Sequence, residues 1–191
     1  MDFAEIMITP LLESERIQLR PFIKEDIPSW FQWFNDREVT IQMNKGAFPN
    51  TELAQEHFLE ALAKSKNDVQ LAIVSKKDHD LIGAIGIHKI DWVHRHADVS
   101  VIIGNKKYWG QGIATEAIGE VVGHAFAKLN LHKLTAGTWA NNIGSRRAFE
   151  KNGFMLEGTL RHQFFFQGGY VDQICLGLLS EDWKKLKGDS L

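Results

Sequence analysis

Two glycines separated by one residue stand at the start of a long segment with helical apolar spacing. They belong to the run Lys107–Ala114, which reads Lys-Tyr-Trp-Gly-Gln-Gly-Ile-Ala. A helix begins with unpaired amides and a partial positive charge, so a glycine loop that leads into it can bind an anion. Gly110 and Gly112 carry no Cβ, which lets the backbone approach a phosphate closely, and Lys107 adds a full positive charge. The spacing therefore predicts a phosphate-binding loop.

Other phosphate-binding loops differ from this run in residues that their chemistry requires. A nucleoside-triphosphate loop needs Gly-Lys-Ser or Gly-Lys-Thr, which the run lacks. A dinucleotide fingerprint needs a third small residue where Thr115 stands. It also needs an acidic residue at the end of the next strand, and the expected strand Lys133–Trp139 ends without one. A nucleotide-binding protein that shares only the loop, and a glycine turn without a ligand, stay open as alternatives.

Several segments after the loop, taken in order, carry a family resemblance. Residues 142–145 read Asn-Ile-Gly-Ser, and residues 147–154 read Arg-Ala-Phe-Glu-Lys-Asn-Gly-Phe. Further on come Leu-Glu-Gly at 156–158, Gly-Tyr-Val-Asp at 169–172 and Glu-Asp-Trp at 181–183. Over residues 12–183 the chain resembles the GNAT superfamily of N-acetyltransferases. It is most similar to the branch of ribosomal-protein N-terminal acetyltransferases and spermidine N-acetyltransferases. The family's loop pattern begins with Gln or Arg, so Lys107 departs from it.

This resemblance implies a co-substrate and a set of residues that hold it. The co-substrate would be acetyl-CoA, without a metal, and the loop amides would bind its pyrophosphate. The strand end at Ile102 would bind the pantetheine amides in a gap between two splayed strands. Asn142 would contact the cofactor, and it independently suits the N-cap of a helix. The implied cofactor-binding residues are Ile102, Ile103, Lys107, Trp109, Gly110, Gln111, Gly112, Ile113, Ala114, Asn142 and Ser145.

Acetyl transfer to an amine also requires that the amine lose a proton. Residues 97–99, Ala-Asp-Val, resemble the Ala-Glu-Ile of histone acetyltransferases, whose glutamate is the general base. Asp98 is therefore the expected catalytic base, although a solvated strand-edge carboxylate or a partner for Arg95 is an equal alternative. The four histidines that rival it, because imidazole titrates near neutrality, are His88, His94, His96 and His162. The His-x-His spacing at 94–96 is more typical of an exposed turn than of a metal site.

The leaving thiolate needs a proton donor or a hydrogen-bond donor. Many family members carry a tyrosine for this role, but the matching residue here is Phe149, which cannot donate. The ribosomal-protein branch places a serine near the sulfur, so Ser145 is the second catalytic candidate. The glutamate base of that branch corresponds to Phe164, and Tyr170 is a remote alternative acid. These departures leave open a non-catalytic acetyl-CoA-binding module.

The residues expected to line the acceptor site are aromatic. The segment Arg161–Gln167 contains three consecutive phenylalanines, and an expected helix near the N-terminus carries Trp30 and Trp33. Successive strand residues point to opposite faces, so at least one phenylalanine must be exposed or lie in an interface, such as that of a homodimer. Aromatic walls suit a peptide, a sugar ring or an aromatic amine, whereas a polyamine site would need several carboxylates. The predicted substrate is a primary amine of a protein N-terminus, a small molecule or an amino-sugar.

The elements that must position these residues follow from the apolar spacing. Alternating or continuous apolar runs predict strands over 17–21, 69–75, 81–90, 97–103, 133–139, 154–157, 160–166 and 174–179, with a turn at Gly168-Gly169. Helices are expected after Asp26 as N-cap, over 51–65, from Ile113 and over 145–152. The order of elements favours an α/β (α+β) fold in one domain over 1–191, with a mixed, mostly antiparallel sheet flanked by helices.

Composition limits the compartment and the partners. The chain has 191 residues and a formal net charge of -2, which offers no basic excess for a nucleic-acid backbone. The N-terminus has no signal-peptide pattern, and no apolar run is long enough to span a membrane. We therefore expect a cytoplasmic protein that binds neither nucleic acid nor membrane. The single cysteine, Cys175, excludes an intramolecular disulfide and is expected to be a small buried hydrophobe.

Overall fold

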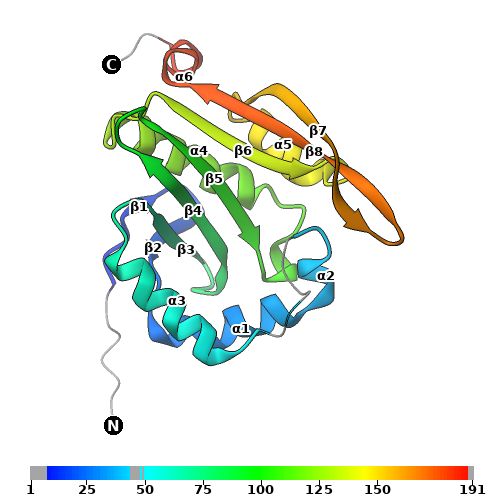
Figure 1. Cartoon of the computed structure of the whole chain (residues 1–191). Helices are drawn as coiled ribbons and strands as arrows, with labels where there is room; N and C mark the ends of the chain where they lie inside the picture. Colours follow the sequence, from blue (N-terminus) through cyan, green and yellow to red (C-terminus); the bar gives the residue numbers. More distant parts are fainter. Residues whose placement is uncertain (1–7, 44–47, 49, 189–191) are drawn as a thin grey trace.

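The structure is a computed structural model that describes residues 8–43, 48 and 50–188. Its centre is an eight-stranded sheet with the order β1-β2-β3-β4-β5-β6-β8-β7 (Figure 1). The strands are β1 (Leu12–Glu13), β2 (Ile17–Pro21), β3 (Val69–Ser75), β4 (Leu81–Asp91), β5 (His96–Ile103), β6 (Lys133–Trp139), β7 (Met155–Phe166) and β8 (Gly169–Leu179). The helices are α1 (Ile27–Asn35), α2 (Arg37–Thr40), α3 (Glu52–Lys64), α4 (Ile113–Ala127), α5 (Ile143–Glu150) and α6 (Ser180–Leu186), and short 3-10 turns cover Lys24–Asp26 and Lys106–Tyr108.

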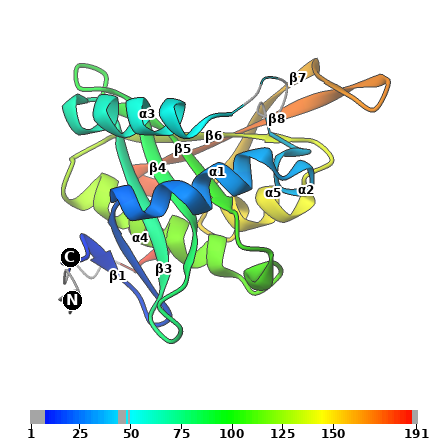
Figure 2. The ribbon, with the colours of Figure 1, turned by 90° about the horizontal axis from the view of Figure 1, so that it is seen from below.

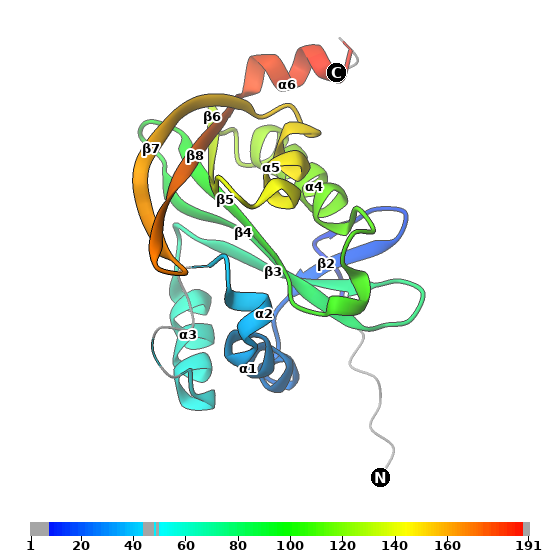
Figure 3. The same ribbon diagram turned by 90° about the vertical axis from the view of Figure 1, so that its right-hand side faces the viewer.

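Neighbouring strands run antiparallel everywhere in this sheet except between β5 and β6, which are parallel. The connection between these two strands contains the glycine loop and α4. Helices cover both faces: α1, α2 and α3 lie on one side of the sheet, and α4 and α5 lie on the other (Figure 3). The predicted mixed, mostly antiparallel sheet flanked by helices is confirmed.

The main core lies between the sheet and α4. The apolar residues of α4 recur at helical spacing and are buried against the strands: Ile113, Ala117, Ile118, Val121, Val122, Ala125 and Phe126. On β5, Ala97 and Val99 point into this core and are buried. Because side chains alternate along a strand, Asp98 and Ser100 point to the opposite face, which carries α1–α3. The fold therefore turns the polar residues of β5 away from its main core.

α1 begins after Asp26, with Pro28 in its first turn, as the sequence predicts. Asp26 is the N-cap residue, as predicted, but its side chain makes no capping hydrogen bond because its carboxylate has other partners. It accepts from the Arg20 guanidinium at 2.7 and 2.8 Å and from the Ile23 amide at 3.0 Å. A charged, two-pronged donor binds a buried carboxylate more strongly than a helix amide does.

The two outer helices of this face differ in how much they bury. Trp33 of α1 is buried, and a Cβ on Gly104 would lie 2.0 Å from its Cδ2 atom, so only glycine leaves room for the indole. α3 begins as predicted, with the Thr51 hydroxyl accepting from the Ala54 amide at 3.1 Å. No residue of α3 is buried, however, and Leu53 is 60% exposed. The side of the sheet that carries Asp98 is therefore covered in part by a helix, α3, that buries none of its own residues (Figure 2).

The end of the chain forms one long hairpin that extends beyond the rest of the sheet (Figures 1 and 2). The two short strands predicted over 154–166 are a single strand, β7, whose register with β8 shifts twice. The turn is Gln167-Gly168 rather than Gly168-Gly169, because Gly169 already pairs with Phe166. Gln167 and Gly168 have φ angles of 49° and 87°, and a type I′ hairpin turn requires positive values at both positions. Cys175 on β8 is partly rather than fully buried.

Candidate active site

The glycine loop presents a row of backbone amides that have no partner in the described part of the chain. The Lys107 amide donates to Asn105 Oδ1 at 3.2 Å, and the Tyr108 and Trp109 amides donate to nearby carbonyls. By contrast, the amides of residues 110–114 have no hydrogen-bond acceptor among the described residues. The row lies at the N-terminus of α4, where the helix dipole also favours an anion. The structure thus leaves the amides of residues 110–114 free to bind a pyrophosphate, rather than all the amides of 107–114 that the sequence predicted.

Both loop glycines have the backbone conformation that other residues rarely adopt. The φ angle is 72° at Gly110 and 79° at Gly112. A Cβ on Gly110 would meet nothing within 4 Å, and one on Gly112 would meet only Arg16 Nη2, at 3.7 Å. The side of the loop that lacks Cβ atoms is therefore open. Unpaired amides beside this open side fit the pyrophosphate of the expected acetyl-CoA.

The side chain of Lys107 does not add its charge to the free amides. Its ammonium lies 3.2 Å from Asp80 Oδ2 and 3.6 Å from Asp78 Oδ2, in the turn between β3 and β4. The buried Tyr108 donates its hydroxyl proton to the same two carboxylates, each at 2.9 Å. The hydrogen bonds from Tyr108 and then Lys107 keep the pKa of Asp80 below its ordinary value. This network fixes the loop to the β3–β4 turn.

Replacing Tyr108 with phenylalanine should lower the free energy of unfolding by about 1–2 kcal/mol, because Asp78 and Asp80 lose a buried donor. The loop should also become less ordered, so that KM for acetyl-CoA rises. Tyr170→Phe is the matched control, since Tyr170 is 64% exposed on the hairpin. Urea unfolding of both variants tests the prediction, and equal losses in the two would contradict it.

Arg16 lies beside the loop, and sequence reasoning did not find it. Its Nη1 donates to the Gln111 carbonyl at 2.9 Å, and its Nη2 lies 2.5 Å from Glu116 Oε2 in the first turn of α4. The Ser14 hydroxyl donates to the same carboxyl group at 2.6 Å. Burial raises the pKa of Glu116, but Ser14 and Arg16 outweigh it and leave the pKa lowered. No local pattern joins Arg16 to a helix 100 residues away.

The two parallel strands separate beside the loop. Pairing between β5 and β6 ends at Asp98 and Thr135, and beyond this point the two strands diverge and leave a gap in their pairing (Figure 1). Ile102 and Ile103 belong to the part of β5 that has no pairing with β6. The Trp109 indole donates to the Ile103 carbonyl at 2.7 Å and so fixes the end of the strand. On the other side of the gap, the buried Thr138 hydroxyl of β6 has no partner among the described residues. An unpartnered buried donor next to an unpaired strand edge fits an amide-bearing chain such as pantetheine.

α5 positions two predicted residues at its first turn. Asn142 is its N-cap, and the side-chain oxygen accepts from the Ser145 amide at 3.1 Å. The prediction that Asn142 is the N-cap of a helix is confirmed. Ser145 is partly buried at the start of this helix. Phe149 is 2% exposed and packs edge-on against Phe154, with ring centroids 5.1 Å apart. Phe149 is therefore a core residue, which leaves Ser145 on α5 as the candidate hydrogen-bond donor to the sulfur.

Asp98 is half exposed, and both of its oxygens have neighbours. Oδ1 accepts from the Thr135 hydroxyl, and Oδ2 lies 3.6 Å from the Lys89 ammonium. The cation paired with it is Lys89 rather than Arg95. The carboxylate thus lies at the point where the gap opens, on the face opposite α4.

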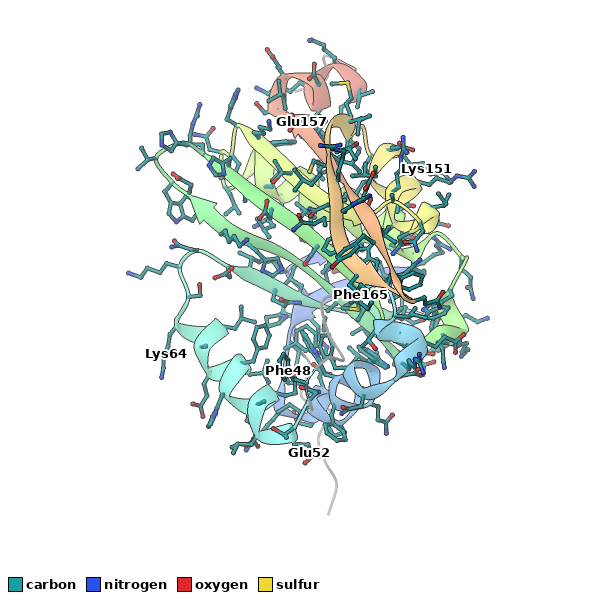
Figure 4. The ribbon with its side chains drawn as sticks, turned by 45° about the vertical axis from the view of Figure 1, so that its right-hand side comes forward. Phe48, Glu52, Lys64, Lys151, Glu157 and Phe165 are labelled. Carbon is teal, nitrogen blue, oxygen red and sulfur yellow. The ribbon has the colours of Figure 1, made fainter. Side chains whose placement is uncertain are left out.

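Aromatic side chains gather on the hairpin as the sequence predicts. Phe164 stacks on Trp139 with centroids 4.5 Å apart, and Phe166 contacts the same indole edge-on at 5.7 Å. Phe165 points the other way, is 66% exposed and lies toward the hairpin tip (Figure 4). His162 stacks on Tyr170 at 6.0 Å. The expectation that one of the three phenylalanines is exposed is confirmed.

Other features lie apart from these residues. His94, in the turn before β5, stacks on His96, the first residue of that strand. Within residues 8–43, 48 and 50–188 no group of three His, Cys, Asp or Glu side chains is arranged for a metal ion. A shallow cavity of 640 Å3 lies between β1, α4 and α6 and is lined by residues such as Leu12, Glu120 and Trp183. No residue of the glycine loop lines it. In the part of the chain that the structure describes, no helix is long and apolar enough to cross a membrane.

Comparisons with known proteins agree with this geometry. The model of the acetyltransferase (GNAT) domain matches residues 16–155. YoaA of Bacillus subtilis (strain 168), an uncharacterized N-acetyltransferase, is 32% identical over 84% of this chain and 90% of its own. The spermidine N(1)-acetyltransferase of Escherichia coli (strain K12) is 29% identical over 83% of each.

Solved structures show the same fold. The spermidine N-acetyltransferase from Vibrio cholerae, in complex with CoA and spermine, superposes with a TM-score of 0.80. The superposition covers 87% of this chain and 97% of that chain at 23% identity, so this likeness concerns the fold. From the family model and the relatives, this chain belongs to the GNAT family of acetyltransferases and is an acetyl-CoA-dependent acyltransferase.

Proposed function

We propose that the protein transfers the acetyl group of acetyl-CoA to a primary amine by direct attack of the amine nitrogen. The observation that carries the proposal is the row of unpartnered amides at 110–114 beside the gap between β5 and β6. The row of amides provides the place for the pyrophosphate of acetyl-CoA. The gap provides the place for the pantetheine chain that follows the pyrophosphate. Together they direct the thioester toward the polar face of β5.

Most of the predicted residues have a role in this proposal. The amides of 110–114 bind the pyrophosphate. The strand edge at Ile102 and Ile103 pairs with the pantetheine chain, and Asn142 keeps α5 in position beside that chain. Ser145 donates a hydrogen bond to the sulfur, in place of the tyrosine that Phe149 replaces. Asp98 faces the amine, either as the base or as the carboxylate that attracts the ammonium. These two roles predict different pH profiles.

The substrate class follows from the face that Asp98 shares. Carboxylates at Asp98 and Asp68 attract a cation, and the aromatic hairpin residues provide apolar walls for the rest of the molecule. This combination favours a small-molecule amine, an amino-sugar or a protein N-terminus. Some relatives are named for spermidine, and a polyamine therefore belongs in any test of acceptors. A cytoplasmic location and a homodimer stay predictions.

The test is release of CoA thiol from acetyl-CoA with a panel of amines: spermidine, a peptide with a free N-terminus, glucosamine and an aromatic ethylamine. The proposal expects thiol release with at least one amine, and about tenfold lower kcat for Ser145→Ala with acetyl-CoA affinity unchanged, because one hydrogen bond to the sulfur is lost. Ser180→Ala at the start of α6 is the control. Tight acetyl-CoA binding without release on any amine would favour the non-catalytic acetyl-CoA-binding module.

A further inference from the structure

Three polar side chains form a chain on the face of the sheet opposite α4. Ser100 Oγ of β5 lies 2.8 Å from His88 Nε2 of β4. On the other side of the ring, His88 Nδ1 lies 3.5 Å from Asp68 Oδ1, in the segment before β3. A carboxylate can only accept, so the proton of the neutral ring belongs on Nδ1, and Nε2 is left to accept from the Ser100 hydroxyl.

The sheet itself holds this imidazole in place. In the β4–β5 register His88 lies opposite Asp98, and Gly86 lies opposite Ser100. The His88 ring reaches Ser100 by folding back over Gly86, where a Cβ would come within 2.5 Å of Nε2. The glycine inside a buried strand thus marks the space that the ring occupies.

Ser100, the exposed member of the Ser100–His88–Asp68 series, lies where the proposed reaction takes place. Ser100 is exposed, two residues beyond Asp98, where the pairing of β5 with β6 stops, and two residues before Ile102. It shares its face with Asp98, by strand alternation. An amine that approaches Asp98 beside the gap therefore meets the Ser100 hydroxyl as well.

The charges around His88 suit a group that is neutral at rest and accepts a proton. They are Asp68 from the segment before β3, Asp98 from β5 and Lys89 on its own strand. Burial lowers the pKa of His88, and the attraction of Asp68 and Asp98 only partly offsets it. Burial raises the pKa of Asp68, but hydrogen bonds from Ser65 and from the Lys89 amide outweigh it, so its pKa lies below the ordinary value.

We infer that His88 accepts the proton of the substrate amine through the Ser100 hydroxyl, with Asp68 orienting the ring. This inference rests on the proposed acetyl transfer and gives Asp98 the role of attracting the ammonium rather than that of the base. His88 is better placed to accept a proton because Nε2 points at an exposed hydroxyl, whereas both oxygens of Asp98 already have neighbours.

The proton balance is simple. A bound ammonium gives one proton to Ser100 Oγ as the Ser100 hydroxyl proton moves to His88 Nε2, so the serine is unchanged and the ring becomes imidazolium. The lone pair of the free amine then forms the C–N bond, and the electron pair of the C–S bond leaves with the sulfur. The second proton lost by the nitrogen neutralises the thiolate, and the imidazolium returns its proton to water.

The experiment measures kcat against pH with the intact protein and an amine that the thiol-release panel identifies. The wild type should lose activity as pH falls through the pKa of His88, because only the neutral ring accepts a proton. His88→Gln should lower kcat about 100-fold and remove this acid limb, while KM for acetyl-CoA stays unchanged. His132→Gln, in the exposed turn before β6, is the control and should keep the wild-type profile.

Two further variants test the mechanism without relying on the fold around position 88. Asp68→Asn should move the acid limb to lower pH, because the negative charge that raises the pKa of His88 is gone. Ser100→Ala should lose activity, and Ser100→Thr should retain it, since it keeps the hydroxyl on a strand. A His88→Gln enzyme with the wild-type acid limb, at any kcat, would overturn the inference. An enzyme that releases no thiol with any amine would instead overturn the proposed function.

Discussion

Gly112→Val should weaken acetyl-CoA binding about 100-fold, or about 2.7 kcal/mol, while leaving the protein folded. The φ angle of 79° at this position is unfavourable for a β-branched residue, so the backbone must shift. That shift displaces the free amides of residues 113 and 114, and the new methyl groups project into the open side of the loop. Hydrogen bonds from amides to a charged phosphate contribute about 1.5–3 kcal/mol each, so the loss of one or two explains the expected effect.

Calorimetric titration of acetyl-CoA measures this effect directly. Gly188→Val is the matched control, because Gly188 also has a positive φ angle, of 63°, and open space where a Cβ would lie. Both variants carry a similar backbone strain, but only the first adjoins the free amides. Similar acetyl-CoA affinities in the two variants would show that the loop does not hold the pyrophosphate.

Asp98→Asn should lower kcat/KM for the amine about tenfold, because a half-exposed carboxylate contributes roughly 1.4 kcal/mol to attracting an ammonium. KM for acetyl-CoA should stay unchanged. Because Asp98 raises the pKa of His88, the acid limb of the kcat profile should move to lower pH rather than vanish. Asparagine keeps an oxygen for the Thr135 hydroxyl, so the strand contact is preserved.

The pH profile separates the two roles of Asp98. If Asp98 were the base itself, the variant would lose about 100-fold or more in kcat and the limb would disappear. Asp182→Asn on α6 is the control, since Asp182 is paired with Lys185 at 3.1 Å and lies far from β5 in the chain. Thiol-release rates between pH 5 and pH 9 for the three proteins give the answer.

Patterns of residues close together in the sequence predicted a large part of this structure. Apolar periodicity placed α4 and most strands, since burying one face of an element needs side chains at its own repeat. Gly110 and Gly112 predicted an open glycine loop before α4, and Asn142 predicted the N-cap of α5. Each of these features depends on residues within a few positions of one another.

Features that join distant segments were decided by the tertiary structure. Lys107 pairs with Asp78 and Asp80 rather than adding to the loop's charge, because the β3–β4 turn folds against it. Packing also decided two features within single segments: the Asp26 carboxylate binds Arg20 instead of capping α1, and α3 buries none of its residues. The gap between β5 and β6 depends on where two strands that belong to distant parts of the sequence stop pairing.

The sequence by itself determined the glycine loop, the family and the order of the elements. The resemblance also gave Asp98, and the tertiary structure added what surrounds it: Thr135 and Lys89 on its two oxygens, and the Ser100–His88–Asp68 chain beside it. The physical reason is that residues adjacent in the sequence set the conformation of a loop. The path of a proton between side chains depends instead on which side chains from separate strands come within hydrogen-bond distance.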